Sequence, residues 1–147
     1  MTWTRGEYQI STEQTRLDLE RIHHYLSTQA YWSLGIPREV VERAFRNSVS
    51  FGVYRAEEQV GWARVVSDRA TFAYLADVFI LPEHRGRGLS KWLMECVLAH
   101  PELQGLRRWM LATRDAHPLY AQFGFTSIPH PERFMQLHFP DVYKKSP

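Results

Sequence analysis

The chain has 147 residues, of which 44% are hydrophobic, and its formal net charge at pH 7 is only +2. This length and apolar content predict one globular domain spanning residues 1–147, with enough apolar side chains to build a core. The modest charge argues against a nucleic-acid-binding protein, whose basic residues are numerous and gather on one face.

Other function classes are excluded by what the sequence lacks. The first residues have no apolar signal-peptide centre, and no apolar run approaches the length of a membrane span. We therefore expect a soluble, cytoplasmic protein with no membrane partner. Cys96 is the single cysteine, so no disulfide can form within the chain, and without a zinc-type spacing of Cys and His we expect no metal.

In chain order, the pattern of apolar residues predicts a strand at 7–11, followed by a helix capped by Thr12 or Thr15 with apolar positions between 17 and 26. An aromatic loop at 31–37 precedes a second helix that has Pro37 in its first turn. Alternating or apolar runs then predict strands at 50–56, 60–67 and 71–81.

The second half of the sequence predicts a helix at 89–99, a strand at 107–113 and a short helix at 116–123. Ile128 and residues 134–139 are candidates for the final strands, and we expect the end of the chain to fray. An antiparallel meander followed by a strand–helix–strand crossover predicts a mixed sheet with helices packed on it, an α/β (α+β) architecture.

The most informative segment is the glycine turn at 85–90, between the predicted strand at 71–81 and the helix at 89–99. Gly86 and Gly88 allow unusual backbone angles, and the first N–H groups of the helix have no intrahelical partner. Arg85, Arg87 and Lys91 add positive charge, so the turn is suited to bind a phosphate group. The alternative is a solvated basic turn. The sequence contains neither a P-loop motif nor the dinucleotide-binding glycine pattern.

Two motifs resemble the GNAT superfamily of acetyl-CoA-dependent N-acetyltransferases. Residues 85–90 are similar to its Q/R-x-x-G-x-G/A signature, and residues 119–125, LYAQFGF, to its L-Y-x-x-x-G-F. The chain departs from the family at Ser90, where glycine or alanine is usual, and at Thr113, where many members carry asparagine. The resemblance implies a mostly antiparallel central sheet with helices on both faces and a splayed pair of parallel strands.

The same resemblance implies that acetyl-CoA binds between the splayed strands as a co-substrate. Its pantetheine arm would pair with the main chain at Phe79, Ile80 and Leu81, and its pyrophosphate would meet the N–H groups of the glycine turn. The cofactor contacts then comprise Phe79, Ile80, Leu81, Arg85, Gly86, Arg87, Gly88, Leu89, Ser90, Lys91, Thr113 and Tyr120.

Transfer of an acetyl group to an amine requires a proton to leave the amine and a proton to reach the departing thiolate. Tyr120 matches the family tyrosine that donates this second proton, although it could instead be a packed aromatic residue. Asp77, a carboxylate in an apolar strand, is the candidate base or amine anchor, and a structural partner for an arginine is the alternative. A β-bulge before Ile80 could turn Asp77 toward the acceptor. Tyr74 and His117 are further candidates for proton transfer.

The acceptor site must come from the N-terminal helices and loop, the central strands and the last hairpin. Candidate walls are Tyr31, Trp32, Trp62, Arg64, Phe72 and Tyr74, and Arg64 could hold an acceptor carboxylate. We expect an N-acetyltransferase for a small-molecule primary amine, with Tyr31, Trp32 and an aromatic C-terminal hairpin as a lid. A protein acetyltransferase and a non-catalytic CoA-binding domain are the alternatives. The protein is expected to be a monomer or a homodimer without nucleic-acid partners.

Overall fold

The structure is a computed structural model that describes residues 1–144. Within these residues the strands are β1 (Thr2–Arg5), β2 (Tyr8–Ser11), β3 (Val49–Arg55), β4 (Glu58–Ser67), β5 (Phe72–Ile80) and β6 (Arg108–Leu111). The helices are α1 (Leu19–Thr28), α2 (Arg38–Arg46), α3 (Leu89–Ala99) and α4 (His117–Ala121). Short 3-10 turns cover Gln14–Arg16, Pro82–His84, Pro101–Leu103 and Pro131–Arg133.

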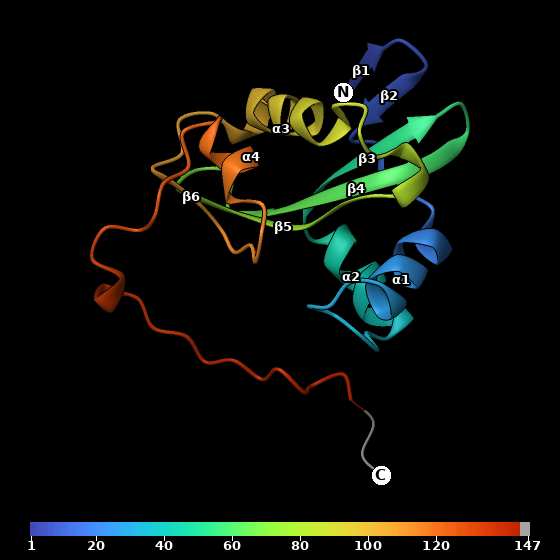
Figure 1. The fold of residues 1–147 in the computed structure, drawn as a ribbon. Helices are drawn as coiled ribbons and strands as arrows, with labels where there is room; N and C mark the ends of the chain where they lie inside the picture. Colours follow the sequence, from blue (N-terminus) through green and yellow to red (C-terminus); the bar gives the residue numbers. More distant parts are fainter. Residues whose placement is uncertain (145–147) are drawn as a thin grey trace.

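The strands form one six-stranded sheet in the order β1-β2-β3-β4-β5-β6. Every neighbouring pair up to β5 is antiparallel, whereas β5 and β6 run parallel because α3 carries the chain from one to the other. Figure 1 shows α3 and α4 on one face of the sheet and α1 and α2 on the other. The predicted fold class, with helices on both faces, is confirmed.

Each face of the sheet has its own apolar core, because side chains alternate along a strand. On β4, Ala63 and Val65 point into the core that contains α3, whereas Trp62 points into the core beneath α1 and α2. The single cysteine, Cys96, is buried in the α3 core, where burial raises the pKa of its thiol to about 12. A thiol in this environment keeps its proton and packs as an apolar group.

Two N-terminal elements differ from the sequence-based predictions. The first helix begins at Leu19 because the Asp18 side chain accepts a hydrogen bond from the Arg21 N–H, so neither Thr12 nor Thr15 is its cap. The residues before it form the 3-10 turn Gln14–Arg16. The strand β1 was not predicted, and it lies at the end of the sheet, paired only with β2.

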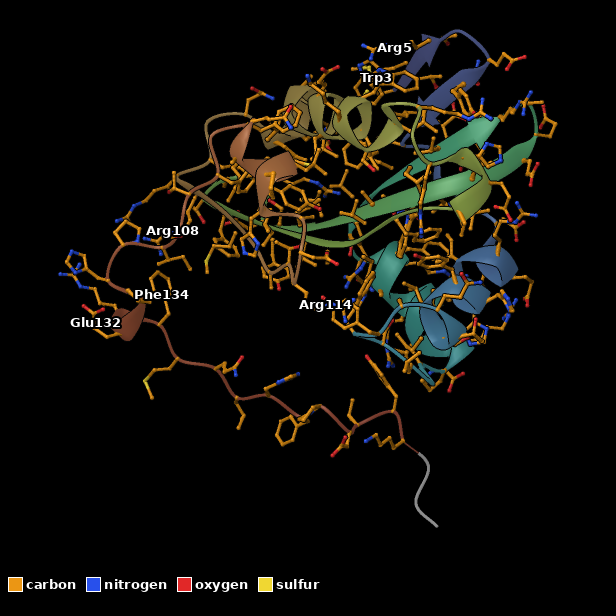
Figure 2. All side chains as sticks on the ribbon, viewed as in Figure 1. Trp3, Arg5, Arg108, Arg114, Glu132 and Phe134 are labelled. Atoms are coloured by element: carbon orange, nitrogen blue, oxygen red, sulfur yellow. The ribbon has the colours of Figure 1, made fainter. Side chains whose placement is uncertain are left out.

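The predicted final strands are wrong within the described residues. Neither Ile128 nor residues 134–139 belong to a strand, and the chain after the turn Pro131–Arg133 is extended and irregular. After Phe134, the large apolar side chains of Met135, Leu137 and Phe139 are exposed, in the stretch that Figure 2 shows leaving the body of the protein. A strand requires a neighbour to share its hydrogen bonds, and no strand among residues 1–144 pairs with residues 134–139. The predicted aromatic hairpin is therefore absent from the described chain.

Gly61 allows β4 and β5 to approach closely where the register between them shifts. A Cβ atom at this position would lie 2.8 Å from the Phe79 carbonyl oxygen, 2.7 Å from Ile80 Cδ1 and 3.3 Å from Val53 Cβ. We expect Gly61→Ala to lower the free energy of unfolding by about 1–3 kcal/mol, the usual cost of forcing extra atoms into a packed core. Denaturant unfolding measures this, and an unchanged midpoint would show that the two strands can separate without cost.

Candidate active site

The parallel strands β5 and β6 separate partway along their length. They pair only from Phe72 with Arg108 to Leu75 with Leu111, and β5 continues to Ile80. The segment Ala76–Ile80 therefore has β4 on one side and the opening between the strands on the other. The Leu81 N–H donates to the Val60 carbonyl of β4. Because peptide groups alternate in direction along a strand, the Ile80 N–H points into the opening.

A β-bulge interrupts β5 at Asp77. Phe79 pairs with Trp62 and Ala76 with Arg64, so Asp77 and Val78 together lie opposite the single residue Ala63. The φ angle of Asp77 is 55°, in the left-handed region that aspartate tolerates better than most residues. The predicted bulge is present.

The bulge reverses which face the following side chains occupy. Leu75 and Ile80 both pack into the α3 core, whereas Phe79 packs beneath α1 and α2. There its ring stacks on Tyr25 with ring centroids 4.0 Å apart. Alternation along an uninterrupted strand would put Leu75 and Phe79 on one face, and the additional residue of the bulge places them on opposite faces.

Asp77 is held by two donors from different parts of the chain. Its Oδ2 accepts a hydrogen bond of 2.8 Å from Arg64 Nε, and its Oδ1 accepts one of 2.7 Å from Trp32 Nε1. Arg64 also donates to Ser48 Oγ over 3.2 Å. The side chains of Arg64 and Asp77 are only 20% and 12% exposed. The structure thus contains the arginine partner that the structural interpretation of Asp77 required, while its role as base or amine anchor stays a prediction.

A cleft of about 700 Å³ opens where β5 and β6 separate, between the loop that follows β6 and the loop joining α1 to α2. Its lining includes most of the residues that the sequence suggested for catalysis and acceptor binding, and one suggested for acetyl-CoA binding, Thr113; the others are Tyr31, Trp32, Arg64, Tyr74, Asp77 and Tyr120. Trp62, another candidate wall, is fully buried in the core instead, and Phe72 lies outside the cleft lining at the start of β5.

The sequence reasoning missed several further lining residues, three of which are charged or aromatic. Arg114 and Asp115 follow β6, and the Arg114 guanidinium lies 4.0 Å from the centre of the Tyr31 ring, which connects the two sides of the cleft. Tyr143 reaches the cleft from the C-terminal segment. No local motif marks these residues, because only long-range folding brings them to the site.

Tyr120 lies in α4 and is 8% exposed. Its ring meets Phe125 edge-on, with centroids 6.0 Å apart, so it is packed as an aromatic core residue and also lines the cleft. Burial raises the pKa of its hydroxyl, and the group therefore keeps its proton at neutral pH. His117, one turn earlier, lines an adjoining hollow that also includes Tyr120 and Thr113.

The glycine turn has the backbone geometry that the sequence predicted. Gly86 and Gly88 have φ angles of 78° and 76°, and a Cβ atom on either would meet no other group within 4 Å. Gly88 is the residue immediately before the first turn of α3. The space beside both glycines is thus open, at the start of a helix whose first N–H groups could bind an anion.

The charged residues of the turn have different positions. Arg85 turns back toward the sheet, where Nε donates to the Ile80 carbonyl over 2.9 Å and a terminal nitrogen donates to the Tyr25 hydroxyl over 3.0 Å. Arg87 and Lys91 instead line a hollow of about 290 Å³ beside Gly88, together with Arg5 from β1. The side chain of Arg85 therefore fixes the turn against β5 and α1, while two of the predicted cations and Arg5 remain beside the helix start.

Residues 19–125 match the family model described as the acetyltransferase (GNAT) family. The chain belongs to the GNAT family of acetyltransferases. A curated protein from Gibberella zeae, named as a candidate acetyltransferase, is 37% identical over 82% of this chain and 79% of its own length. The crystal structure of a candidate GNAT acetyltransferase from Xanthomonas campestris pv. campestris is 50% identical, covers 97% of this chain and 100% of its own, and has a TM-score of 0.93.

Family membership makes this GNAT chain an acyltransferase, and the family uses acetyl-CoA. A GNAT structure from Elizabethkingia anophelis with acetyl-CoA bound shares the fold, at 10% identity and a TM-score of 0.63 over 85% of this chain and 80% of its own.

Among residues 1–144, no group of three or more His, Cys, Asp or Glu side chains is placed to hold a metal ion. None of the helices described here has the length and apolar character of a membrane span.

The contacts of Asp77 lead to a stability prediction. Asparagine tolerates the same backbone angle and can still accept from Trp32, but Asp77→Asn removes the negative charge opposite Arg64. Breaking a fully buried pair costs about 3–5 kcal/mol, and the residual exposure of this pair lowers our expectation to about 2 kcal/mol. Denaturant unfolding of Asp77→Asn, Arg64→Gln and the double variant should give strongly non-additive losses. Additive losses would show that the ion pair is not the cause.

Proposed function

We propose that this chain transfers the acetyl group of acetyl-CoA to the primary amine of a small molecule, by direct attack within a ternary complex. The observation that carries the proposal is the cleft at the separation of β5 and β6, because it brings Tyr120 and Asp77 together with the aromatic residues of the α1–α2 loop. The remaining steps assign acetyl-CoA, the acid, the amine position and the acceptor to parts of this arrangement.

Acetyl-CoA is placed by the backbone of two elements. The pyrophosphate accepts hydrogen bonds from the N–H groups at the start of α3, and Arg87 and Lys91 supply positive charge beside it. The pantetheine arm continues into the opening between β5 and β6, where the Ile80 N–H points. Arg85 holds the Ile80 carbonyl and so fixes the distance between the turn and the end of β5. Thr113 lies on the β6 side of the same cleft.

Tyr120 is the general acid in this proposal. The tetrahedral intermediate collapses when the carbon–sulfur bond breaks, and the tyrosine hydroxyl gives its proton to the departing thiolate of CoA. Burial raises the pKa of Tyr120, so the proton is present when the thiolate forms. The packing against Phe125 fixes the ring that carries the hydroxyl.

Asp77 is proposed to position or deprotonate the amine. Each of its oxygens accepts one hydrogen bond, from Arg64 or from Trp32. A carboxylate oxygen has two lone-pair sites, so each oxygen retains capacity for an amine N–H. Arg64 and Trp32 then fix the carboxylate at the end of the bulge, on the same side of the sheet as the acceptor cleft.

The aromatic lining of the cleft favours a small acceptor over a protein. Tyr31, Trp32, Tyr74 and Tyr143 supply aromatic walls, and the contact between Arg114 and Tyr31 crosses between the two loops. Aromatic surfaces of this kind bind flat or cationic amines. The lid that we expected from a C-terminal hairpin is replaced by these loops and by Tyr143. The alternative is a protein amine, which would require the two loops to separate.

Acetyl-CoA binding tests the assignment of the glycine turn. Gly88→Glu places a side chain and a negative charge in front of the α3 N–H groups, and we expect calorimetry to detect no acetyl-CoA binding. Gly105→Glu is the matched control, because Gly105 has a φ angle of 72° and equally open surroundings but lies in the loop before β6. Unchanged affinity in Gly88→Glu, or equal losses in both variants, would contradict the assignment.

Kinetics test the assignment of Tyr120. Tyr120→Phe should lower kcat by roughly 10²- to 10⁴-fold, the usual contribution of general acid catalysis, while acetyl-CoA affinity and Tm change little. In the unsubstituted protein, the raised pKa predicts that the alkaline fall in kcat lies above about pH 10, the ordinary tyrosine range. Release of the CoA thiol against a panel of small amines and peptides is the readout. Normal turnover in Tyr120→Phe would return Tyr120 to a packing role.

A further inference from the structure

We propose that Tyr25 is a positioning residue of the acetyl-CoA site, and that its side chain holds the glycine turn and the end of β5 at the spacing that acetyl-CoA binding requires. The inference rests on the proposed function, in which the turn binds the pyrophosphate and β5 binds the pantetheine arm. Tyr25 lies in α1, far from both elements in sequence, and its hydroxyl accepts a hydrogen bond of 3.0 Å from Arg85. It therefore acts through Arg85 rather than on the reacting atoms.

The direction of Arg85 depends on neutral partners. Its Nε donates to the Ile80 carbonyl over 2.9 Å, and a terminal nitrogen donates to the Tyr25 hydroxyl. None of the ion pairs formed within residues 1–144 includes Arg85. The guanidinium therefore keeps its positive charge beside the turn without a carboxylate to hold it. The two hydrogen bonds are what fix the direction of this long, rotatable side chain.

Tyr25 is itself well fixed, so it can serve as an anchor. Its ring stacks on the ring of Phe79, with centroids 4.0 Å apart and an angle of 12° between the two planes. Both residues are buried, Tyr25 at 7% exposure and Phe79 at 4%. Ile22 and Leu26 of the same helix are buried in the same core. The hydroxyl is therefore carried by a ring that close packing beneath α1 and α2 holds in place.

This one side chain contacts a backbone segment at both of its ends. The Tyr25 ring contacts Phe79 at the start of the segment 79–85. The Tyr25 hydroxyl contacts Arg85 at the end of the same segment. The segment contains the Ile80 N–H, which points into the opening between β5 and β6, and it leads directly into the glycine turn and α3. Tyr25 thus sets the spacing between the backbone donors proposed for the pantetheine arm and those proposed for the pyrophosphate. Donors held in place before binding lose little freedom when the ligand arrives.

Removing the hydroxyl should weaken acetyl-CoA binding without unfolding the protein. Tyr25→Phe keeps the stacked ring and leaves Arg85 with one of its two hydrogen-bond acceptors. The turn then also populates arrangements that do not bind, and the apparent Kd rises in inverse proportion to the competent fraction. We expect the Kd for acetyl-CoA to rise about tenfold, which corresponds to about 1.4 kcal/mol and lies near the usual strength of a hydrogen bond to a charged group.

Calorimetry of acetyl-CoA binding to the full chain, arranged as a double-mutant cycle, tests the proposal. Tyr25→Phe, Arg85→Met and the double variant are compared with the unsubstituted protein, and thermal unfolding is recorded for each. Because the hydroxyl acts through Arg85, Tyr25→Phe should raise the Kd in the unsubstituted background and have no further effect in the Arg85→Met background. A tyrosine that only packs would give the same loss in both backgrounds. Unchanged affinity in Tyr25→Phe, or additive losses in the double variant, would overturn the proposal.

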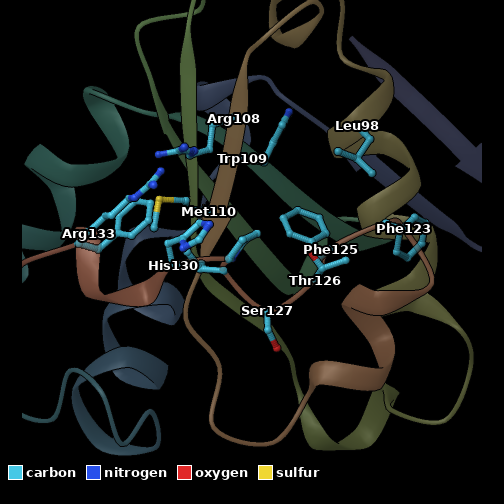
Figure 3. A pocket seen from close by; sticks show the side chains of 14 residues that line it. Leu98, Arg108, Trp109, Met110, Phe123, Phe125, Thr126, Ser127, His130 and Arg133 are labelled. Atoms are coloured by element: carbon cyan, nitrogen blue, oxygen red, sulfur yellow. The ribbon is translucent and has the colours of Figure 1, made fainter.

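Two matched controls separate this role from general effects. Tyr54→Phe also removes a buried hydroxyl, one that has no hydrogen-bond partner within residues 1–144. Arg133→Met removes the same charge as Arg85→Met, from the lining of a groove of about 470 Å³ beside β6 (Figure 3). Both control variants should bind acetyl-CoA with unchanged affinity. A loss in either control equal to that in its matched variant would also overturn the proposal.

Gly88→Glu distinguishes failure of this proposal from failure of the proposed function. If Gly88→Glu abolishes acetyl-CoA binding and Tyr25→Phe binds normally, the acetyl-CoA site stands and the role given to Tyr25 is wrong. If Gly88→Glu binds normally, the site at the turn and the role of Tyr25 fail together. Turnover of a small amine gives a second readout. Tyr25→Phe should raise the KM for acetyl-CoA and leave kcat unchanged, and a fall in kcat at unchanged KM would contradict a positioning role.

Discussion

The left-handed backbone of Asp77 adds one residue to β5 opposite Ala63, and the ion pair with Arg64 holds that residue in place. Much of the proposed site depends on this local change. Before the bulge, Leu75 faces α3; after it, Phe79 faces α1 and stacks on Tyr25. The change also brings a carboxylate to the cleft without placing an unpaired charge in the core, because Arg64 and Trp32 both donate to it.

The end of β5 and the start of α3 are connected by one arginine. Arg85 binds the Ile80 carbonyl and the Tyr25 hydroxyl, so the glycine turn cannot move independently of β5 or of α1. Beneath the turn, the Tyr8 hydroxyl and His84 Nδ1 share a buried hydrogen bond of 2.9 Å. These contacts make the turn a rigid support, and rigid backbone donors stabilise a bound anion without being reordered when it binds.

Local patterns in the sequence determined the elements whose hydrogen bonds and apolar stripes are internal. The helix at 89–99, the glycine turn before it and the 119–125 motif fall into this class. The bulge at Asp77 depends on the pairing of β5 with β4, and the sequence offered it only as a possibility. The cleft also gathers Tyr31, Trp32, Arg64 and Tyr74, whose role in acceptor binding stays a prediction. Tertiary structure decided the rest. The direction of Arg85, the partners of Asp77 and the arrival of Tyr143 at the cleft depend on contacts between residues far apart in sequence. The segment 134–139 shows the reason most clearly: alternation makes it suited to be a strand, but only a neighbouring strand, in the same chain or another, can supply its hydrogen bonds.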